Sequence, residues 1–380
     1  MDLDFFYRIL SVDSTSGKEA ELADMLSVEF AAPGRKVELF EVGDGTKNLL
    51  VSWGTPKIIF CTHLDTVPPY IAPYHEGSLI AGRGTCDAKG QLFAMWEACK
   101  QLEAKGCSDF ALLLLAGEET GSFGAKAFNK LMSENPSVIL SEPSVILSEA
   151  KDLSPEDIWV IVGEPTDNCM ASAAKGTKAF EVEFEGKAFH SGYPENGISA
   201  VELFNDFMNA LRSIRFPKDE LLGETTFNVG KLVSDNPQNI LSEKLTCRVY
   251  FRTTFESDEM VCNVMKNMAG PDAKLRFGRP RVQDGSDIVA KEVAQWQRSM
   301  TVKSFGGDAP TRFEVLPGFE VKPVSFGSDA PQLHCFGHKI LYGPGSILVA
   351  HRPEEYITLA DIETAVANYM KMYEAIMNKR

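Results

Sequence analysis

Two histidines and several carboxylates stand just after apolar, strand-like runs of the sequence, at separate places along the chain. They are His63 and Asp65 after IIFCT, Glu118 and Glu119 after ALLLLAG, Glu164 after IWVIVG, and His351 after ILVA. Asp87 adds a carboxylate in the loop GRGTCDAKG, just before a helix-type pattern. In open α/β sheets the loops at the carboxyl ends of the strands converge and build sites. We therefore expect these side chains to gather at one edge of a sheet.

This combination of side chains suits divalent metal ions. Carboxylates that converge without a cation repel one another and lose hydration, which costs several kcal/mol. Imidazole together with carboxylate oxygen favours zinc, with cobalt and manganese as substitutes. Two metal ions that share a bridging carboxylate need about five ligands, and about five are on offer here. The sequence therefore predicts a site for one or two divalent ions.

The neighbours of the expected ligands suggest a division of labour. His63 and Asp65 lie on the same side of an extended segment. We predict that His63 binds metal while Asp65 accepts the free N–H of its ring and fixes its tautomer. Glu118 and Glu119 are adjacent and cannot both point the same way. One of them can hold metal while the other acts as a general base towards water.

The elements that must position these residues alternate between strand and helix. Strand-like runs are VELFEV, NLLVSW, IIFCTH and FALLLLAG, and helix-type patterns run from about 18 to 30 and through QLFAMWEACKQLEAKG. Ser14, Thr15 and Ser16 are predicted to cap the first of these helices. Several strands are continuous apolar runs, which is typical of strands covered on both faces. We predict an α/β fold with a mostly parallel mixed sheet flanked by helices.

The pattern changes from about Lys175. KAFEVEFEGKA, TTFNVGKLV and KLTCRVYFRTTF alternate apolar and polar residues, as half-exposed antiparallel strands do. Two helix-type segments accompany them, and AKLRFG near 274–278 is predicted to be an edge strand. We therefore predict an α/β domain from residues 1–173 and 285–380, interrupted by an inserted α+β domain at 174–284.

Composition excludes several classes of protein. The 380 residues carry a formal net charge of −15, which argues against a nucleic-acid or anionic-membrane partner. No apolar run approaches the roughly 20 residues that a membrane span needs. The acidic start MDLDFFYRIL lacks a basic n-region, so we expect a cytoplasmic location. Eight cysteines without a CxxC pair are expected to be free thiols in a reducing compartment.

A tandem duplication interrupts the chain at 136–149, where PSVILSE occurs twice. A proline in each copy forbids a continuous helix, and we interpret the segment as a surface insertion. Its SEPS imitates GEPT, so that Glu142 competes with Glu164 for the role of ligand. Glu164 is preferred because it follows a proper strand.

HLDTVP, GRGTCDAKG, GEETGSFGA, GEPTD and HSG occur in this order and span nearly the whole chain. Together they resemble the two-zinc amidohydrolase and metallopeptidase family of acetylornithine deacetylase, succinyl-diaminopimelate desuccinylase, aminoacylase and glutamate carboxypeptidase. The resemblance implies two zinc ions with these ligands: His63 and Glu164 for one, Glu119 and His351 for the other, and Asp87 between them. It implies that Glu118 is the base that deprotonates the attacking water and later protonates the leaving amine.

The resemblance also implies residues that contact substrate. His190 matches the histidine that polarises the scissile carbonyl. Arg252 and Asn239 lie where the family holds the substrate carboxylate or the oxyanion, and an arginine offers a bidentate fork for a carboxylate. Gly327 and Ser328, in GSDAP, are expected to bind an α-carboxylate through their main-chain N–H groups. In the family the inserted domain is a lid that mediates dimerisation, so we expect a homodimer.

Within the family, GPGSILVAHRPEEYI is most similar to acetylornithine deacetylase. We expect a small-molecule substrate, N-acetyl- or N-succinyl-ornithine, deacylated in arginine biosynthesis. The alternatives on the same scaffold are a succinyl-diaminopimelate desuccinylase and a dipeptidase or carboxypeptidase. A non-catalytic relative that binds an acylated amino acid is a further alternative, but such a relative would be expected to have lost Glu118 or a zinc ligand.

Overall fold

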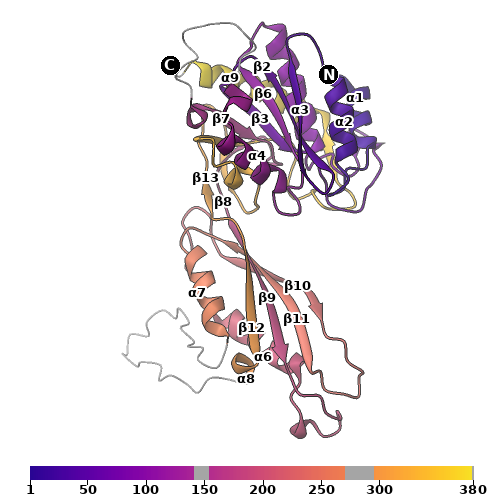
Figure 1. Cartoon of the computed structure of the whole chain (residues 1–380), viewed down its shortest axis with the longest axis vertical. Helices are drawn as coiled ribbons and strands as arrows, with labels where there is room; N and C mark the ends of the chain where they lie inside the picture. The colour runs from indigo at the N-terminus through magenta and orange to yellow at the C-terminus, as the bar shows by residue number, and fades with distance from the viewer. Residues whose placement is uncertain (141–153, 270–294, 379–380) are drawn as a thin grey trace. The chain divides into compact units, whose positions relative to one another are not determined.

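The computed structural model describes residues 1–140, 154–269 and 295–378, which fold as two compact units (Figure 1). Unit 1 comprises Met1–Ser172, Arg312–Lys322 and Ser328–Arg380, and unit 2 comprises Ala173–Thr311 and Pro323–Gly327. The edge strand predicted at 274–278, the alternative ligand Glu142 and most of the tandem duplication lie outside the described residues.

A six-stranded mixed sheet forms the centre of unit 1, in the order β1-β2-β6-β3-β7-β15. The strands are β1 (Lys36–Gly43), β2 (Thr46–Trp53), β3 (Ile58–His63), β6 (Phe110–Leu115), β7 (Trp159–Val162) and β15 (His338–Leu341). β6, β3, β7 and β15 run parallel, whereas β2 is antiparallel to both of its neighbours. All residues of β3 and β6 are buried, because flanking helices shield the sheet from water (Figure 1). The predicted fold class is confirmed.

Among the described residues of unit 1, the α-helices are α1 (Leu3–Ser11), α2 (Ala20–Glu29), α3 (Lys89–Ala104), α4 (Phe123–Glu134), α5 (Ser137–Leu140) and α9 (Leu359–Met377). α3 packs against α9 and against β3 and β6, and most of its residues are buried. A capping box starts α9: the Thr358 hydroxyl accepts from the N–H of Asp361, whose carboxylate accepts from the N–H of Thr358. A small antiparallel sheet contains β4 (Tyr74–Glu76), β5 (Leu79–Ala81) and β16 (Tyr356–Thr358), with β5 in the middle.

A polar group is built into the aromatic core where β2 ends. The Arg35 guanidinium lies 5.6 Å from the ring centre of Trp53 and 5.0 Å from that of Trp96. The Glu103 carboxylate accepts from Arg35 Nε and from Trp53 Nε1, each at 2.8 Å. These hydrogen bonds, that to Arg35 foremost, hold the pKa of Glu103 below its ordinary value. Glu103 thereby ties α3 to β2.

Unit 2 is built around a four-stranded antiparallel sheet in the order β10-β11-β9-β12. Its elements are β9 (Gly176–Glu185), α6 (Ala200–Ser213), β10 (Thr226–Val233), β11 (Lys244–Thr253), α7 (Asp258–Met268), α8 (Gln295–Arg298) and β12 (Met300–Gly306). Buried residues alternate along β9 and β11, and their apolar side chains pack with those of α6 and α7. The predicted insertion stops at 284, whereas unit 2 continues to Thr311 because β12 pairs with β9.

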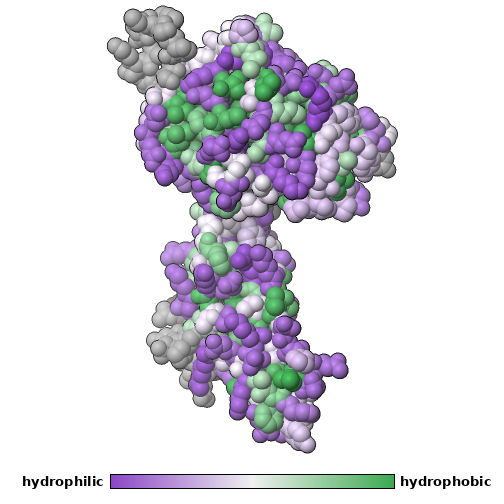
Figure 2. Space-filling model, turned by 45° about the vertical axis from the view of Figure 1, so that its right-hand side comes forward, coloured by the Kyte–Doolittle hydropathy of each residue, from purple (hydrophilic) through white to green (hydrophobic). Residues whose placement is uncertain are grey.

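A third sheet, of order β13-β8-β14, lies where the chain passes from one unit to the other. It consists of β8 (Met170–Ala174), β13 (Thr311–Arg312) and β14 (Val321–Val324). All eight cysteines are among the described residues and are free thiols. Over the described ranges, no helix combines the length and apolarity needed to cross a bilayer. On the face seen in Figure 2 hydrophilic side chains predominate and apolar ones form smaller patches.

Candidate metal centre

β6, β3 and β7 are parallel neighbours, so their carboxyl ends lie at one edge of the unit 1 sheet. His63 is the last residue of β3, Glu118 and Glu119 follow β6, and Glu164 follows β7. The parallel pairing therefore brings these side chains to the same edge, as the sequence pattern predicts. Asp87 arrives from the loop before α3.

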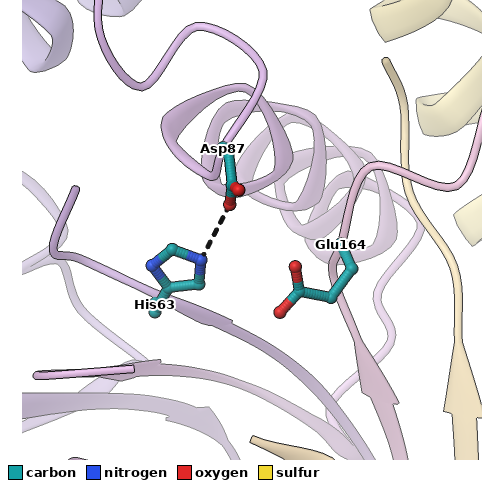
Figure 3. Close-up of side chains that lie close together, drawn as sticks. All are labelled: His63, Asp87 and Glu164. Carbon is teal, nitrogen blue, oxygen red and sulfur yellow. Dashed lines mark hydrogen bonds and ion pairs between the residues drawn. The ribbon is translucent and has the colours of Figure 1, made fainter. Parts of the chain in front are cut away.

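Two groups of three side chains meet there and share Asp87. His63, Asp87 and Glu164 form one group, shown in Figure 3, and Asp87, Glu119 and His351 form the other. Within each group the potential ligand atoms lie within 4.8 Å of one another. His63 Nε2 is 3.1 Å from Asp87 Oδ1, and His351 Nε2 is 3.2 Å from Asp87 Oδ2. Each oxygen of Asp87 therefore faces a different imidazole, which is the arrangement that a bridging carboxylate requires.

The electrostatics of the cluster favour positive charge. Burial raises the pKa of Glu118 and of Glu164 well above the ordinary value, and neighbouring carboxylates add to the effect. Hydrogen bonds to Asp87 and Glu119 raise the pKa of His351 to about 10. The pKa of His63 is also well above its ordinary value: burial lowers it, but the carboxylates of Asp65 and Asp87 prevail. The raised pKa values of the two histidines and of the two glutamates show that the cluster attracts positive charge, and a dication would supply that charge.

The donor set fits two divalent cations. Two imidazole nitrogens and three carboxylates form two sites with one shared ligand, and the group of His63, Asp87 and Glu164 is buried, with exposed fractions of 5% or less. His351 is the exposed member, and its backbone adopts a left-handed conformation with φ of 63°. We infer that Asp87 would hold both ions. His63 and Glu164 would hold one of them, and Glu119 and His351 would hold the other.

Asp65 acts differently from the sequence-based prediction. His63 Nδ1 lies 2.9 Å from the main-chain carbonyl oxygen of Asp65 and 3.5 Å from its carboxylate Oδ1. The carbonyl therefore makes the shorter contact with the ring, because the chain bends at Leu64, directly after β3. The carboxylate also bonds to the loop of Glu118 and Glu119. Its Oδ1 accepts the N–H of Glu118 at 2.9 Å and its Oδ2 accepts the N–H of Glu119 at 3.2 Å.

Ser16 belongs to the same network and is missed by the sequence-based reasoning. Its hydroxyl donates to Asp65 Oδ2 at 2.7 Å. The sequence predicts that Ser14 and Ser16 cap the first long helix, but α2 begins at Ala20 with Glu19 as its N-cap. Ser14 instead donates to the carbonyl of Leu64 at 2.8 Å. In the sequence, small polar residues before a helix look the same whether they cap that helix or bond to a distant segment.

The side chains of Glu118 and Glu119 have different partners, as the sequence predicts for adjacent residues. Glu119 Oε1 lies 2.8 Å from His351 Nε2, in the second group. Glu118 belongs to neither group, although its main-chain N–H is fixed by Asp65. A half-buried carboxylate of raised pKa beside the ligands, but not among them, is suited to accept a proton.

Asp329 is another residue that the sequence-based reasoning misses. Its side chain is 2% exposed, and its charge contributes to the raised pKa of both Glu118 and Glu164. It lies in the loop GSDAP, in which the sequence predicts only Gly327 and Ser328 as substrate contacts. The Ser328 side chain is buried and accepts from the N–H of Ala330 at 3.3 Å.

Unit 2 contains His190 and Asn239. They lie on adjoining segments, since the N–H of Ser191 donates to the carbonyl of Asn239 at 2.9 Å. The ring of His190 is exposed, and its Nδ1 accepts from the N–H of Gly192 at 3.0 Å. That bond places the proton of a neutral ring on Nε2. His190 is thereby set up to donate a hydrogen bond.

Arg252 and Gly327 also lie close together in unit 2. The Arg252 guanidinium stands over the ring of Tyr250, with 5.1 Å to its centre. A Cβ on Gly327 would lie 3.6 Å from Arg252 Nη1, an ordinary contact distance, so the two residues are neighbours. An arginine whose guanidinium stacks on an aromatic ring can still offer its N–H groups to a carboxylate.

Comparisons with known proteins agree with the geometry. The sequence profile described as "Peptidase family M20/M25/M40" matches residues 59–375. A peptidase M20 domain-containing protein of Schizosaccharomyces pombe is 29% identical over 379 residues, which cover 96% of this chain and 82% of that protein. An Aspergillus niger protein named "Probable carboxypeptidase" is 30% identical over 416 residues, covering 99% of this chain and 90% of that protein.

Solved structures share the fold. A tripeptidase from Staphylococcus aureus superposes with a TM-score of 0.73 at 18% identity, covering 99% of this chain and 98% of that chain. An M20 family metallo-carboxypeptidase from Sulfolobus solfataricus gives a TM-score of 0.67 at 16% identity, with 99% of both chains covered. At these identities the likeness extends to the fold alone.

Proposed function

Since this chain belongs to peptidase family M20/M25/M40, we propose that it hydrolyses the amide bond of an N-acyl amino acid with the help of two zinc ions. The observation that carries the proposal is the pair of three-residue groups that share Asp87, with Glu118 beside them but in neither. An enzyme that had lost its chemistry would not need to retain a half-buried base next to a complete ligand set.

The residues of the chain divide the work of hydrolysis. Bound divalent ions supply Lewis acidity and make water a nucleophile near neutral pH. Glu118 accepts the proton from the attacking water and returns it to the departing amine. Asp65 holds the main chain of Glu118 in place for both transfers. For His190, in unit 2, we propose the role that the resemblance implies, polarisation of the scissile carbonyl by a donated hydrogen bond.

We propose an N-acyl-ornithine as the substrate, with either an acetyl or a succinyl group. The support is the stretch GPGSILVAHRPEEYI, which resembles acetylornithine deacetylase. A carboxypeptidase is the second candidate, and the name of the Aspergillus niger relative supports it. Both candidates release an amino acid with a free α-carboxylate, for which Arg252 and the N–H groups of Gly327 and Ser328 are the proposed contacts.

Release of the free amino acid tests these candidates side by side. N-acetyl-L-ornithine, N-succinyl-L-ornithine and N-blocked dipeptides are incubated with the zinc-loaded protein, with chelator-treated protein and Glu118→Gln as controls. Chelator-sensitive release of ornithine supports the deacylase, and release of the C-terminal residue of the dipeptides supports the carboxypeptidase. Absence of turnover on the whole panel by a protein that binds two zinc ions would refute both substrates.

We further propose a homodimer formed through unit 2. β10 is an edge strand of its sheet, and Leu232 and Val233 at its end are 54% and 57% exposed. An exposed apolar edge strand is a surface on which another chain can pair. Light scattering across a concentration series measures the mass directly, and a monomer at every concentration would refute the proposal.

A further inference from the structure

We propose that Arg83 and Glu355 are positioning residues that hold the loops of Asp87 and His351 in the geometry needed for two metal ions. This inference rests on the proposed function, because it concerns the loops that supply its ligands. Neither residue belongs to a ligand group, and both side chains are buried, with Arg83 2% and Glu355 0% exposed.

Glu355 fixes the main chain at Asp87. Its Oε1 accepts the N–H groups of both Cys86 and Asp87, each at 3.0 Å. Two main-chain bonds to a single carboxylate oxygen restrict the position of the backbone from which the Asp87 side chain extends. Because the two oxygens of Asp87 must face two different histidines, a small rotation of this backbone would break one contact or the other.

Arg83 connects this anchor to the loop of His351. Its Nη1 donates to Glu355 Oε2 at 2.5 Å and to the carbonyl of Arg352 at 3.2 Å. Its Nε donates to the carbonyl of Pro69 at 3.3 Å. Arg352 directly follows His351, the exposed ligand with a left-handed backbone. The guanidinium therefore supports the ligand that has the least packing of its own.

The fold places this pair between the two loops. β5 and β16 pair antiparallel, so the residues after β5 lie beside the residues before β16. The N–H of Gly82 donates to the carbonyl of Glu355 at 3.0 Å, which extends that pairing. The loop from Gly82 to Asp87 and the loop from His351 to Glu355 thus leave one small sheet at adjacent points.

The choice of a charged pair argues for positioning rather than for stability. A buried ion pair loses much of its Coulomb energy to desolvation, and apolar residues of the same volume often stabilise a fold as well or better. Apolar residues cannot accept main-chain N–H groups or donate to carbonyls. What Arg83 and Glu355 supply is a set of directed bonds to the main chain beside two ligands.

The test is calorimetric titration of zinc into chelator-treated full-length protein, with thermal unfolding measured in parallel. Glu355→Gln should weaken the binding of both zinc ions by about 10- to 100-fold, because Asp87 is a proposed ligand of both. Arg83→Lys keeps a positive charge for Glu355, but a lysine cannot reach the carbonyls of both Pro69 and Arg352. It should therefore weaken the binding of the ion at His351 and leave the binding of the other ion unchanged. Glu354→Gln is the matched control, since that exposed residue pairs only distantly with Arg352, at 3.9 Å.

The outcomes separate the two proposals. Wild-type zinc affinities in Glu355→Gln and Arg83→Lys, with only the melting temperature lowered, would overturn the positioning role and leave the proposed function standing. A wild-type protein that binds no zinc would overturn the proposed function and this inference with it. Should Glu355→Gln fail to fold, selective weakening of one ion in Arg83→Lys supports the inference, and unchanged affinity refutes it.

Discussion

Replacing Asp65 by asparagine is expected to slow catalysis through the loop of Glu118 and Glu119, and not through loss of the metal ion at His63. The substitution keeps the shape of the side chain and removes one acceptor oxygen. The main-chain carbonyl that contacts His63 Nδ1 at 2.9 Å is unchanged, so the imidazole keeps its support. Of the two N–H groups that the carboxylate accepts, those of Glu118 and Glu119, only one can keep an oxygen acceptor.

The expected loss of stability follows from the three groups that donate hydrogen bonds to the Asp65 carboxylate. The amide oxygen of asparagine can keep the N–H of Glu118, and the Ser16 hydroxyl can reverse and accept from the amide nitrogen. The N–H of Glu119 is then left facing another donor, which costs about 1–3 kcal/mol. Loss of the charge weakens the remaining bond by about 1 kcal/mol. We expect about 2–4 kcal/mol of lost stability and, for a base displaced by about 1 Å, a fall in kcat of about 100-fold.

Zinc content, zinc affinity and steady-state kinetics of Asp65→Asn distinguish the two roles of this residue. The expected result is a reduced kcat that saturating zinc does not restore, with the ion at His63 retained. Ser16→Ala, which removes one donor and leaves both carboxylate oxygens, is the graded control and should have a smaller effect on kcat. If Asp65→Asn lost an ion and excess zinc restored wild-type kcat, the carboxylate would act on His63 instead and our reasoning would be refuted.

Four further predictions follow from the structure. Glu118→Gln should lower kcat by about 10²- to 10⁴-fold with two zinc ions still bound; turnover near the wild-type rate would show that another group is the base. Chelation should lower the melting temperature and zinc should restore it, and zinc affinity should rise from pH 5 to 8 because protons compete for the ligands; a flat pH profile would contradict this. Glu103→Gln should cost about 1–3 kcal/mol in urea unfolding at pH 7. Because the folded-state pKa of Glu103 is depressed, its contribution is present above the unfolded pKa of about 4.3 and lost as the pH falls through the folded value; the exposed Glu374→Gln, a control, should change little at any pH. Gly124→Ala should destabilise by at least about 1–3 kcal/mol, since its Cβ would lie 2.5 Å from Ala116 main-chain atoms, whereas Gly230→Ala, with nothing within 4 Å, should be tolerated.

The sequence was sufficient to predict the fold class and the residues that would converge. Both depend on local patterns: apolar runs of strand length, and polar residues directly after them. His63, Glu119 and Glu164 could be selected because parallel strands bring their carboxyl ends together whatever the rest of the chain does. The grouping around Asp87 was implied by the family resemblance of its loop, which precedes α3 and does not follow a strand of the main sheet.

The tertiary structure alone decided which groups hold those ligands in place. Ser16 and Asp65 are 49 residues apart, and Arg83 and Glu355 are 272 apart. The strand β12, which extends unit 2, likewise pairs with β9 far away in sequence. The physical reason is that a hydrogen bond depends on the direction of a side chain after distant segments have packed. Periodicity and composition record where a side chain is buried, but not which distant main-chain group it meets there.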